Sequence, residues 1–297
     1  MLESGAHKPG NVSIVTNFEN TRYEHFLASA VAVAPCFEHA AECGIAVSQG
    51  ELFASEVGVG RIMKDCVESI NAWQHGGNTL LGTVILLSPL AVAAGMTSGE
   101  KGIYEIAELR KNLRLVVEST TPEDAVNLYE AVRIANPSGL GKAPDLDVNN
   151  PDSISRILAE KITLYQIFQI AADYDTICSE WVNNYKITFD YAYPALRKCI
   201  GKMNDVSTAT IQTFLKVLAA YPDTFIARKT GFEKAKEVSA KAEKILQLGA
   251  LETLEGRKSL HRFDEELRAS SNLLNPGTTA DIIAAALALC ILGGYRP

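Results

Sequence analysis

Three short segments of this 297-residue chain combine glycine with amide or hydroxyl side chains, a pattern that suits the binding of an anion. These corners are His7-Lys8-Pro9-Gly10-Asn11, His75-Gly76-Gly77-Asn78-Thr79 and Asn275-Pro276-Gly277-Thr278-Thr279-Ala280-Asp281. Glycine lets the backbone approach a ligand closely, and the first turn of a helix offers unpaired N–H groups. One such corner is usually only a helix cap. Because three are spread along the chain, we predict that they converge on a polyanion such as a nucleotide.

The first two corners supply polar side chains that could contact phosphate or base. Lys8 and Asn11 flank a Pro-Gly turn, so a charge and an amide could face one phosphate. Asn78 or Thr79 could cap the helix that follows, and His75 could contact a base or a phosphate. The alternatives are structural, since chain ends are often loose, this cap is common, and a lone histidine more often holds structure together.

The third corner adds Asn275 and Thr278 and ends in an acid. Asp281 lies one turn into the final apolar helix, and residues 282–292 carry no charge. An aspartate at the edge of such a run is either a partner of the helix dipole or a functional carboxylate in a dry site. The sequence leaves these two interpretations open.

A fourth segment, residues 221–231, joins an acid to a basic pair. Asp223 could cap a short helix that presents Arg228 and Lys229 further along. A carboxylate for the metal and cations for phosphate oxygens would suit a magnesium–polyphosphate ligand. A capped helix with a solvated end explains the segment equally well. The acids of 173–175 are typical of a solvated helix junction.

The elements that must position these residues are mostly helical in pattern. Apolar residues spaced by three and four predict a helix over 56–73, and Thr121-Pro122-Glu123-Asp124 is a strong start signal for another. A capped helix is expected from about residue 21 to Glu42, with Pro35 as a kink and Gly44 as its end. Further helices are expected over 121–134, 152–172, 174–184, 187–200, 206–219, 231–247, 251–270 and 278–292.

The predicted fold is all-α, with one domain over 1–297. Only 113–117 resembles a strand, and no alternation of strands and helices appears. The polar, Pro- and Gly-containing stretch of about 136–151 is expected to be a long surface loop, with a mobile lid as an alternative. Residues 69–99 contain no charged side chain, so the helix inside this run is expected to be a largely buried central helix. A membrane span is the less favoured interpretation, because Gly82, Ser88 and Pro89 interrupt the run.

Composition excludes some classes of protein. With 28 Lys and Arg against 35 Asp and Glu, the formal net charge is -7, which argues against non-specific nucleic-acid binding. The six cysteines form no CxxC pair, which suits buried thiols in a reducing compartment. No signal peptide is evident at the start, so we expect a cytoplasmic protein.

The motifs taken together resemble the triphosphoribosyl-dephospho-CoA synthase family, in its archaeal and methylotroph branch. The shared segments are Lys-Pro-Gly-Asn-Val, Phe-Leu-Ala-Ser-Ala, Gly-Gly-Asn-Thr, Asp-Thr-x-x-x-Arg-Lys-x-Gly and Asn-Pro-Gly-Thr-Thr-Ala-Asp, in the family's order over nearly the whole chain. The resemblance implies an all-α transferase that moves the triphosphoribosyl group of ATP to the 2'-hydroxyl of 3'-dephospho-CoA and releases adenine.

The resemblance also implies roles for the candidate residues. Lys8, Arg228 and Lys229 would hold phosphates, with neutral hydrogen bonds from Asn11, Asn78 and Thr79. Asp223 and Asp281 would bind Mg²⁺ or act as the base. His75, Asn275 and Thr278 complete the expected nucleotide site. Family members carry a helix ahead of Lys-Pro-Gly, so residues 1–6 are expected to be the end of one.

The chain departs from the family pattern at four positions. Leu80 and Leu81 stand where members usually have His-Lys, and Ser13 and Asn20 stand where acids are typical. Two alternatives therefore stay open: an enzyme acting on another cofactor precursor, of the methanopterin type, and a nucleotide- or CoA-binding protein without catalysis. A homodimer is compatible with the sequence, which does not fix the oligomeric state.

Overall fold

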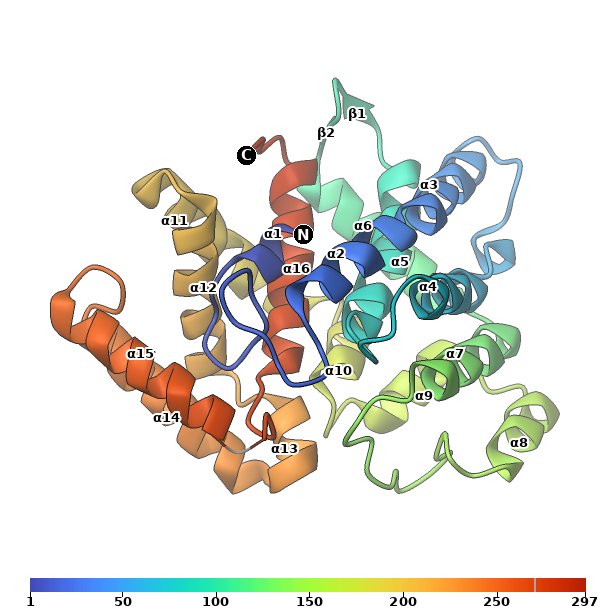
Figure 1. The fold of residues 1–297 in the computed structure, drawn as a ribbon. Coiled ribbons are helices and arrows are strands. Elements are labelled where there is room, and N and C mark those ends of the chain that lie inside the picture. The colour runs from blue at the N-terminus through green and yellow to red at the C-terminus, as the bar shows by residue number, and fades with distance from the viewer. Residues whose placement is uncertain (270) are drawn as a thin grey trace.

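The chain folds into a bundle of packed helices with one small hairpin (Figure 1). The computed structural model describes residues 1–269 and 271–297. In its first half, the elements are α1 (Leu2–Gly5), α2 (Tyr23–Ala32), α3 (Ala34–Ser48), η1 (Ala54–Glu56), α4 (Val59–Trp73), α5 (Leu81–Met96), β1 (Gly99–Glu100), β2 (Ile103–Tyr104), α6 (Ile106–Glu118) and α7 (Pro122–Ala135). In its second half they are α8 (Asp152–Glu160), α9 (Leu164–Ala171), α10 (Thr176–Val182), η2 (Thr188–Ala192), α11 (Tyr193–Met203), α12 (Val206–Ala220), α13 (Thr224–Thr230), α14 (Phe232–Gln247), α15 (Leu254–Ala269) and α16 (Gly277–Leu292). The all-α prediction is confirmed.

Two apolar helices, α5 and α16, pack against each other inside the bundle. α5 also packs against α3, α4, α6 and α10, and most of its side chains are buried, as predicted for the central helix. Pro89 has no N–H for the carbonyl of Ile85, which instead accepts a hydrogen bond from Trp181 Nε1 at 3.2 Å. The carbonyl of Leu86 accepts one from the Tyr185 hydroxyl at 3.1 Å. Buried aromatic side chains thus satisfy the backbone near the proline.

The glycine expected to end the helix that begins near residue 21 has a packing role instead. That predicted helix is in fact two helices, α2 and α3, which meet at Val33. α3 continues past Gly44 to Ser48, because Gly44 lies against the backbone of α5. A Cβ atom there would be 2.0 Å from the carbonyl oxygen of Val92, and one at Gly95 would be 2.0 Å from that of Ala41. The prediction that Gly44 stops the helix is therefore wrong.

The expected strand at 113–117 is also wrong, since these residues belong to α6. Leu109, Leu113, Val116 and Val117 are buried, at the three- and four-residue spacing of a helix face. The strands found are the two-residue β1 and β2, which pair in antiparallel fashion. The helix expected over 152–172 is two helices, because Lys161 adopts a left-handed conformation (φ 55°) between α8 and α9.

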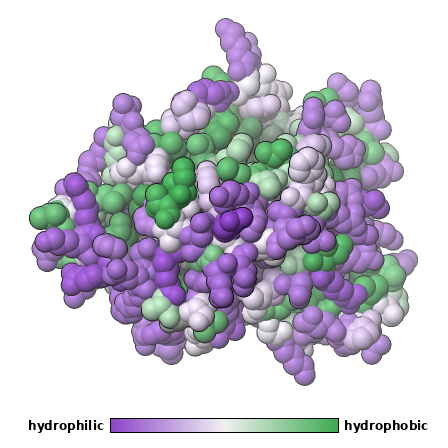
Figure 2. All heavy atoms as spheres, in the orientation of Figure 1, coloured by the Kyte–Doolittle hydropathy of each residue, from purple (hydrophilic) through white to green (hydrophobic). Residues whose placement is uncertain are grey.

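Figure 2 shows that hydrophilic side chains cover most of the outer ridges on the face seen in Figure 1. Apolar side chains appear on this face in smaller patches among them. Over the described residues, one helical stretch, Tyr23–Ser48, is long and apolar enough to cross a membrane by length and composition. It contains α2 and α3, and 22% of its most apolar window is buried.

Candidate functional site

A cavity of about 780 Å³ lies where the three corners meet. All three corners contribute to its wall, which confirms the predicted convergence; the contributing residues are Asn11, Asn78, Thr79, Asn275, Gly277, Thr278, Ala280 and Asp281. The opposite wall comes from α7, α9, α10 and the segment 136–151 between α7 and α8. Residues distant in the sequence thus share one hollow.

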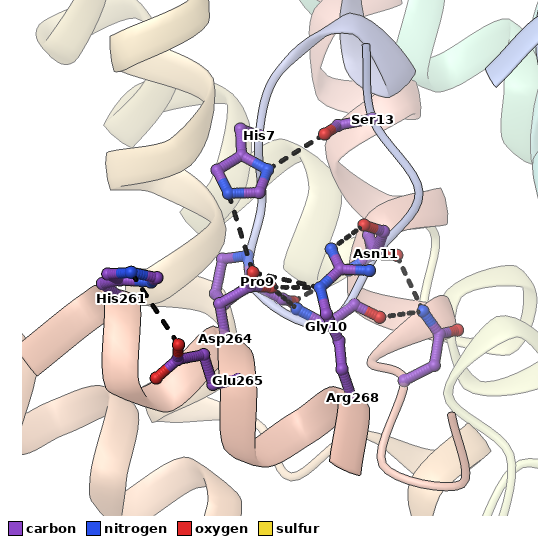
Figure 3. A network of polar contacts seen from close by, with 10 residues as sticks. His7, Pro9, Gly10, Asn11, Ser13, His261, Asp264, Glu265 and Arg268 are labelled. Carbon is purple, nitrogen blue, oxygen red and sulfur yellow. Dashed lines mark hydrogen bonds and ion pairs between the residues drawn. The ribbon is translucent and has the colours of Figure 1, made fainter. Parts of the chain in front are cut away.

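The first corner is fixed by α15 (Figure 3). Asp264 accepts a hydrogen bond from the Gly10 N–H at 2.7 Å and pairs with Arg268, whose Nε is 2.9 Å away. Arg268 in turn donates to the carbonyl of Asn11. Gly10 has φ 72°, and a Cβ there would be 2.9 Å from the side chain of Leu267, so the turn requires glycine. The corner is therefore held firmly, unlike a loose chain end.

Asn275 joins the third corner to the first. Its Nδ2 donates to the carbonyl of Gly10 at 2.6 Å and to Asn11 Oδ1 at 3.1 Å. Thr278, in the first turn of α16, is buried, and its hydroxyl lies 3.4 Å from that of Thr224 on α13. These contacts bring the starts of α13 and α16 to the same wall of the cavity.

The second corner opens onto α5. Asn78 Oδ1 accepts from the N–H of Leu81 at 3.1 Å, and the Thr79 hydroxyl lies 2.7 Å from that of Ser29 on α2. Leu80 and Leu81 also line the cavity, so its wall is apolar at the two positions where the resemblance implied a His-Lys pair. His75 is exposed and is not among the lining residues.

Asp281 presents a carboxylate to the cavity. The Thr83 hydroxyl donates to its Oδ1 at 2.6 Å, and Gly82 makes room for Oδ2, since a Cβ at Gly82 would be 2.0 Å from it. Burial raises the pKa of Asp281 to about 7; the Thr83 hydrogen bond opposes this, and the negative charges of Glu3 and Asp223 add to it. A carboxyl group that titrates near neutrality is suited to proton transfer at physiological pH.

Asp223 has a different place from the one expected for a catalytic or metal-binding acid. It is 2% exposed and does not line the cavity. Its Oδ1 accepts from the N–H groups of Phe225 (2.9 Å) and Ile226 (3.1 Å), and its Oδ2 from the N–H (2.7 Å) and hydroxyl (2.8 Å) of Thr279. Burial raises its pKa, and these hydrogen bonds oppose the rise. Asp223 therefore fastens α13 to α16.

Arg228 and Lys229 bring positive charge to the cavity wall. Arg228 pairs with Asp175, the cap of α10. The Lys229 ammonium lies 3.6 Å from the centre of the Phe225 ring, within range of a cation–π contact. Burial lowers its pKa to about 8, and the charge of Asp223 opposes this while that of Arg228 adds to it. The two cations expected from the sequence therefore lie together.

Lys8 is turned away from the cavity. Its side chain is fully buried, its ammonium lies 2.9 Å from the Glu3 carboxylate, and it donates to the carbonyls of Glu3 (2.5 Å) and Ala6 (3.1 Å). Glu3, on the single-turn helix α1, lines the cavity. Lys8 thus positions Glu3 in this structure and does not face the phosphate site.

The residues predicted for the site did not include three polar ones that line the cavity and contact its charged groups: Glu3, Thr83 and Asp175. Thr83 lies four residues after Thr79, and this helical spacing could have placed both on one face. Asp175 was taken as solvated, yet it pairs with Arg228, and only the fold brings them together. Glu3 follows the start of the chain and gave no signal beyond its charge.

The charge on the cavity wall is negative. Two cations face five acids there: Arg228 and Lys229 against Glu3, Asp145, Asp147, Asp175 and Asp281. Among the residues that the structure describes, no group of three or more His, Cys, Asp or Glu side chains could enclose a metal ion. A polyphosphate bound here would need additional positive charge.

Comparison with known proteins assigns the family. A family model described as ATP:dephospho-CoA triphosphoribosyl transferase matches residues 1–297. The 2-(5''-triphosphoribosyl)-3'-dephosphocoenzyme-A synthase of Pectobacterium atrosepticum is 25% identical over 93% of this chain and 80% of its own. A protein of Pectobacterium carotovorum named "Probable 2-(5''-triphosphoribosyl)-3'-dephosphocoenzyme-A synthase" is also 25% identical, over 95% of this chain and 77% of its own. A crystal structure from Archaeoglobus fulgidus, titled as a "putative triphosphoribosyl-dephospho-coA synthase", has the same fold, with a TM-score of 0.66 and 24% identity over 91% of this chain and 100% of that one. The chain therefore belongs to the ATP:dephospho-CoA triphosphoribosyl transferase family.

Proposed function

We propose that this chain transfers the triphosphoribosyl group of ATP to the 2'-hydroxyl of 3'-dephospho-CoA and releases adenine. Membership of the family supports the reaction. We place the reaction in this cavity because of Asp281. Its carboxylate has a raised pKa and faces a hollow that all three corners build. The departures at Leu80 and Leu81 remove a cation from the wall and leave the carboxylate in place.

In the proposed reaction, the bond between C1' of the ATP ribose and N9 of adenine breaks. A bond forms between that carbon and the 2'-oxygen of dephospho-CoA. Asp281 would accept the proton of the 2'-hydroxyl as the oxygen attacks, and adenine would leave carrying one proton in exchange. Thr83 would orient the carboxylate through its hydrogen bond to Oδ1. The cavity would hold both substrates in line for the transfer.

Arg228 and Lys229 would bind the triphosphate. Arg228 is fixed by Asp175, and Lys229 carries no carboxylate partner among the described residues, so its charge is available to a phosphate. The first turns of α5 and α16 would contribute N–H groups and the side chains of Asn78, Thr79 and Thr278. Asn11 and Asn275 would bind neutral parts of the substrates. His75 and Lys8 lie outside this arrangement.

Mg²⁺ would supply the positive charge that the wall lacks. Glu3 lines the cavity and would be the carboxylate ligand of the ion. Asp281, whose Oδ2 lies against Gly82, would hold the ion instead only if it does not serve as the base. Mg²⁺ typically takes one or two carboxylates together with substrate phosphates and waters, so no protein cage is needed. Asp223 does not fit, since four donors already occupy its oxygens. When bound, the ion would neutralise the triphosphate.

We also propose a cytoplasmic enzyme, in keeping with its expected substrates and with six free cysteines. The homodimer stays a prediction, and light scattering on the purified protein would test it.

The test is adenine release. The purified protein is incubated with ATP, dephospho-CoA and MgCl₂, and adenine and the coupled product are followed by chromatography and mass spectrometry. We expect adenine in amounts equal to the product, and none when dephospho-CoA or Mg²⁺ is left out. Binding of both substrates without adenine would favour a binding protein. Thermal stabilisation by pterins alone would favour an enzyme of another cofactor pathway.

A further inference from the structure

The cavity has two ends of different chemistry. The corners, α13 and Asp281 form the polar end. At the other end, α7, α9, α10 and the segment 136–148 contribute mainly aliphatic side chains: Leu128, Val132, Leu140, Ile167, Ile170 and Ile177. Gly139 of this segment packs against Lys229, where a Cβ would be 2.7 Å from the Lys229 Cγ, so the segment spans both ends.

Phosphate does not suit the aliphatic end. No Lys, Arg or His among the described residues lines it, and its two acids are already engaged. Asp145 pairs with Arg156 at 2.6 Å, while Asp147 accepts from the N–H groups of Ala143 (2.8 Å) and Asn149 (2.7 Å). Their charges would repel a phosphate, so this end favours a neutral group.

Adenine suits it less well than a flexible aliphatic chain does. The hydrogen-bonding edge of a base is matched by amide side chains, and every asparagine that lines the cavity lies at the polar end: Asn11, Asn78, Asn272 and Asn275. The Tyr129 hydroxyl of the aliphatic end already donates to the carbonyl of Leu146. The rest of that end is mainly apolar surface, to which Tyr174 adds a second hydroxyl.

On the basis of the proposed function, we infer that the aliphatic end binds the pantetheine arm of dephospho-CoA. This arm is neutral, and its dimethyl and methylene groups match the side chains of α7 and α9. Its pyrophosphate would then reach the polar end, beside the triphosphate of ATP, and the adjoining ribose would lie toward Asp281. The arm would thus be the part of the acceptor that this chain recognises by apolar contact.

The test compares dephospho-CoA with ADP, which lacks only the pantetheine arm, by calorimetric titration. Ala171, half-buried on α9, lines the aliphatic end, whereas Gln169 on the same helix is exposed and does not. We expect Ala171→Trp to weaken dephospho-CoA binding by roughly tenfold or more, since it displaces apolar contacts, and to change ADP binding by less than about twofold. Gln169→Trp, which introduces the same side chain outside the cavity, should change neither.

A milder variant, Val132→Ala, keeps the test valid if tryptophan disturbs the fold. It should weaken dephospho-CoA binding a few-fold and leave ADP binding unchanged. The inference would be overturned if the variants lost equal affinity for both ligands, or if the wild-type protein bound ADP as tightly as dephospho-CoA. Neither result would affect the proposed function. Failure of the unchanged protein to bind either ligand would remove the proposed function as well.

Discussion

The starts of α13 and α16 each carry an aspartate, and the two differ in what surrounds the carboxylate. Asp223 at α13 receives four hydrogen bonds and is closed off from the cavity. Asp281 at α16 receives a side-chain hydrogen bond from Thr83 and has its other oxygen beside Gly82, at the cavity wall. A carboxylate whose oxygens are filled by backbone donors stabilises the fold. One with an oxygen left open at a cavity wall can take a proton or an ion.

The substitution Asp281→Asn tests the catalytic role that this comparison gives to Asp281. We expect the rate of adenine release to fall by about 10²–10⁴-fold, the usual contribution of a general base. The folded structure should persist, because the amide oxygen can still accept from Thr83. Steady-state kinetics and a thermal melt measure the two effects. A variant that keeps more than a tenth of the activity would exclude Asp281 as the base.

The pH dependence tests the same carboxylate. Since its pKa is about 7 when folded and the usual value is 3.8, kcat/KM should rise roughly tenfold per pH unit below 7 and level off above it. Stability should change in the opposite direction. Between about pH 4 and 7 the folded chain binds a proton that the unfolded chain has released, so the Asp281 contribution to stability is lost as the pH rises through 7.

Asp281→Asn provides the control for the pH effects. The variant has no titrating group at this position, so its melting temperature should lose this part of the slope between pH 5 and 8. Melts of both proteins at several pH values give the comparison. An identical slope in the two would mean that Asp281 is already ionised throughout this range.

The substitution Asp223→Asn tests the stabilising role that the comparison gives to Asp223. The amide can accept from the α13 N–H groups, but its NH₂ would face the two donors of Thr279. We expect a loss of about 2–3 kcal/mol in the free energy of unfolding, from an impaired cap and unsatisfied buried donors. Urea titration measures it. Wild-type stability together with lost activity would reverse the roles assigned to the two aspartates.

The substitution Thr83→Val tests the hydrogen bond to Asp281 and has the smallest expected effect. The side chains have similar shapes, and only the hydrogen bond to Asp281 is removed. Because that bond favours the ionised form, the pKa of Asp281 should rise further, and the midpoint of the pH–rate profile should shift upward. The maximal rate should fall by no more than roughly 100-fold, because a hydrogen bond to a charged group contributes about 1.5–3 kcal/mol. An unshifted midpoint would show that Thr83 does not orient the carboxylate.

Local patterns predicted much of the fold. The spacing of apolar residues gave most helices, and the charge-free run around α5 predicted a buried helix. The errors came where a neighbour decides the outcome. Gly44 looked like a helix end but serves the close approach of α3 to α5, and 113–117 looked like a strand because a five-residue window shows too little periodicity.

The sequence by itself determined the helical class, the three glycine–amide corners and the family, because each depends on residue types at short, fixed spacings. Only the tertiary structure decided which charged groups face the cavity. The side chains of Lys8 and Asp223 are already paired with partners that the fold places beside them. The fold also brings three other residues to the site: Glu3, Thr83 and Asp175. The physical reason is that a polar group is available to a ligand only if its neighbours leave it unsatisfied, and those neighbours are set by packing across the whole chain.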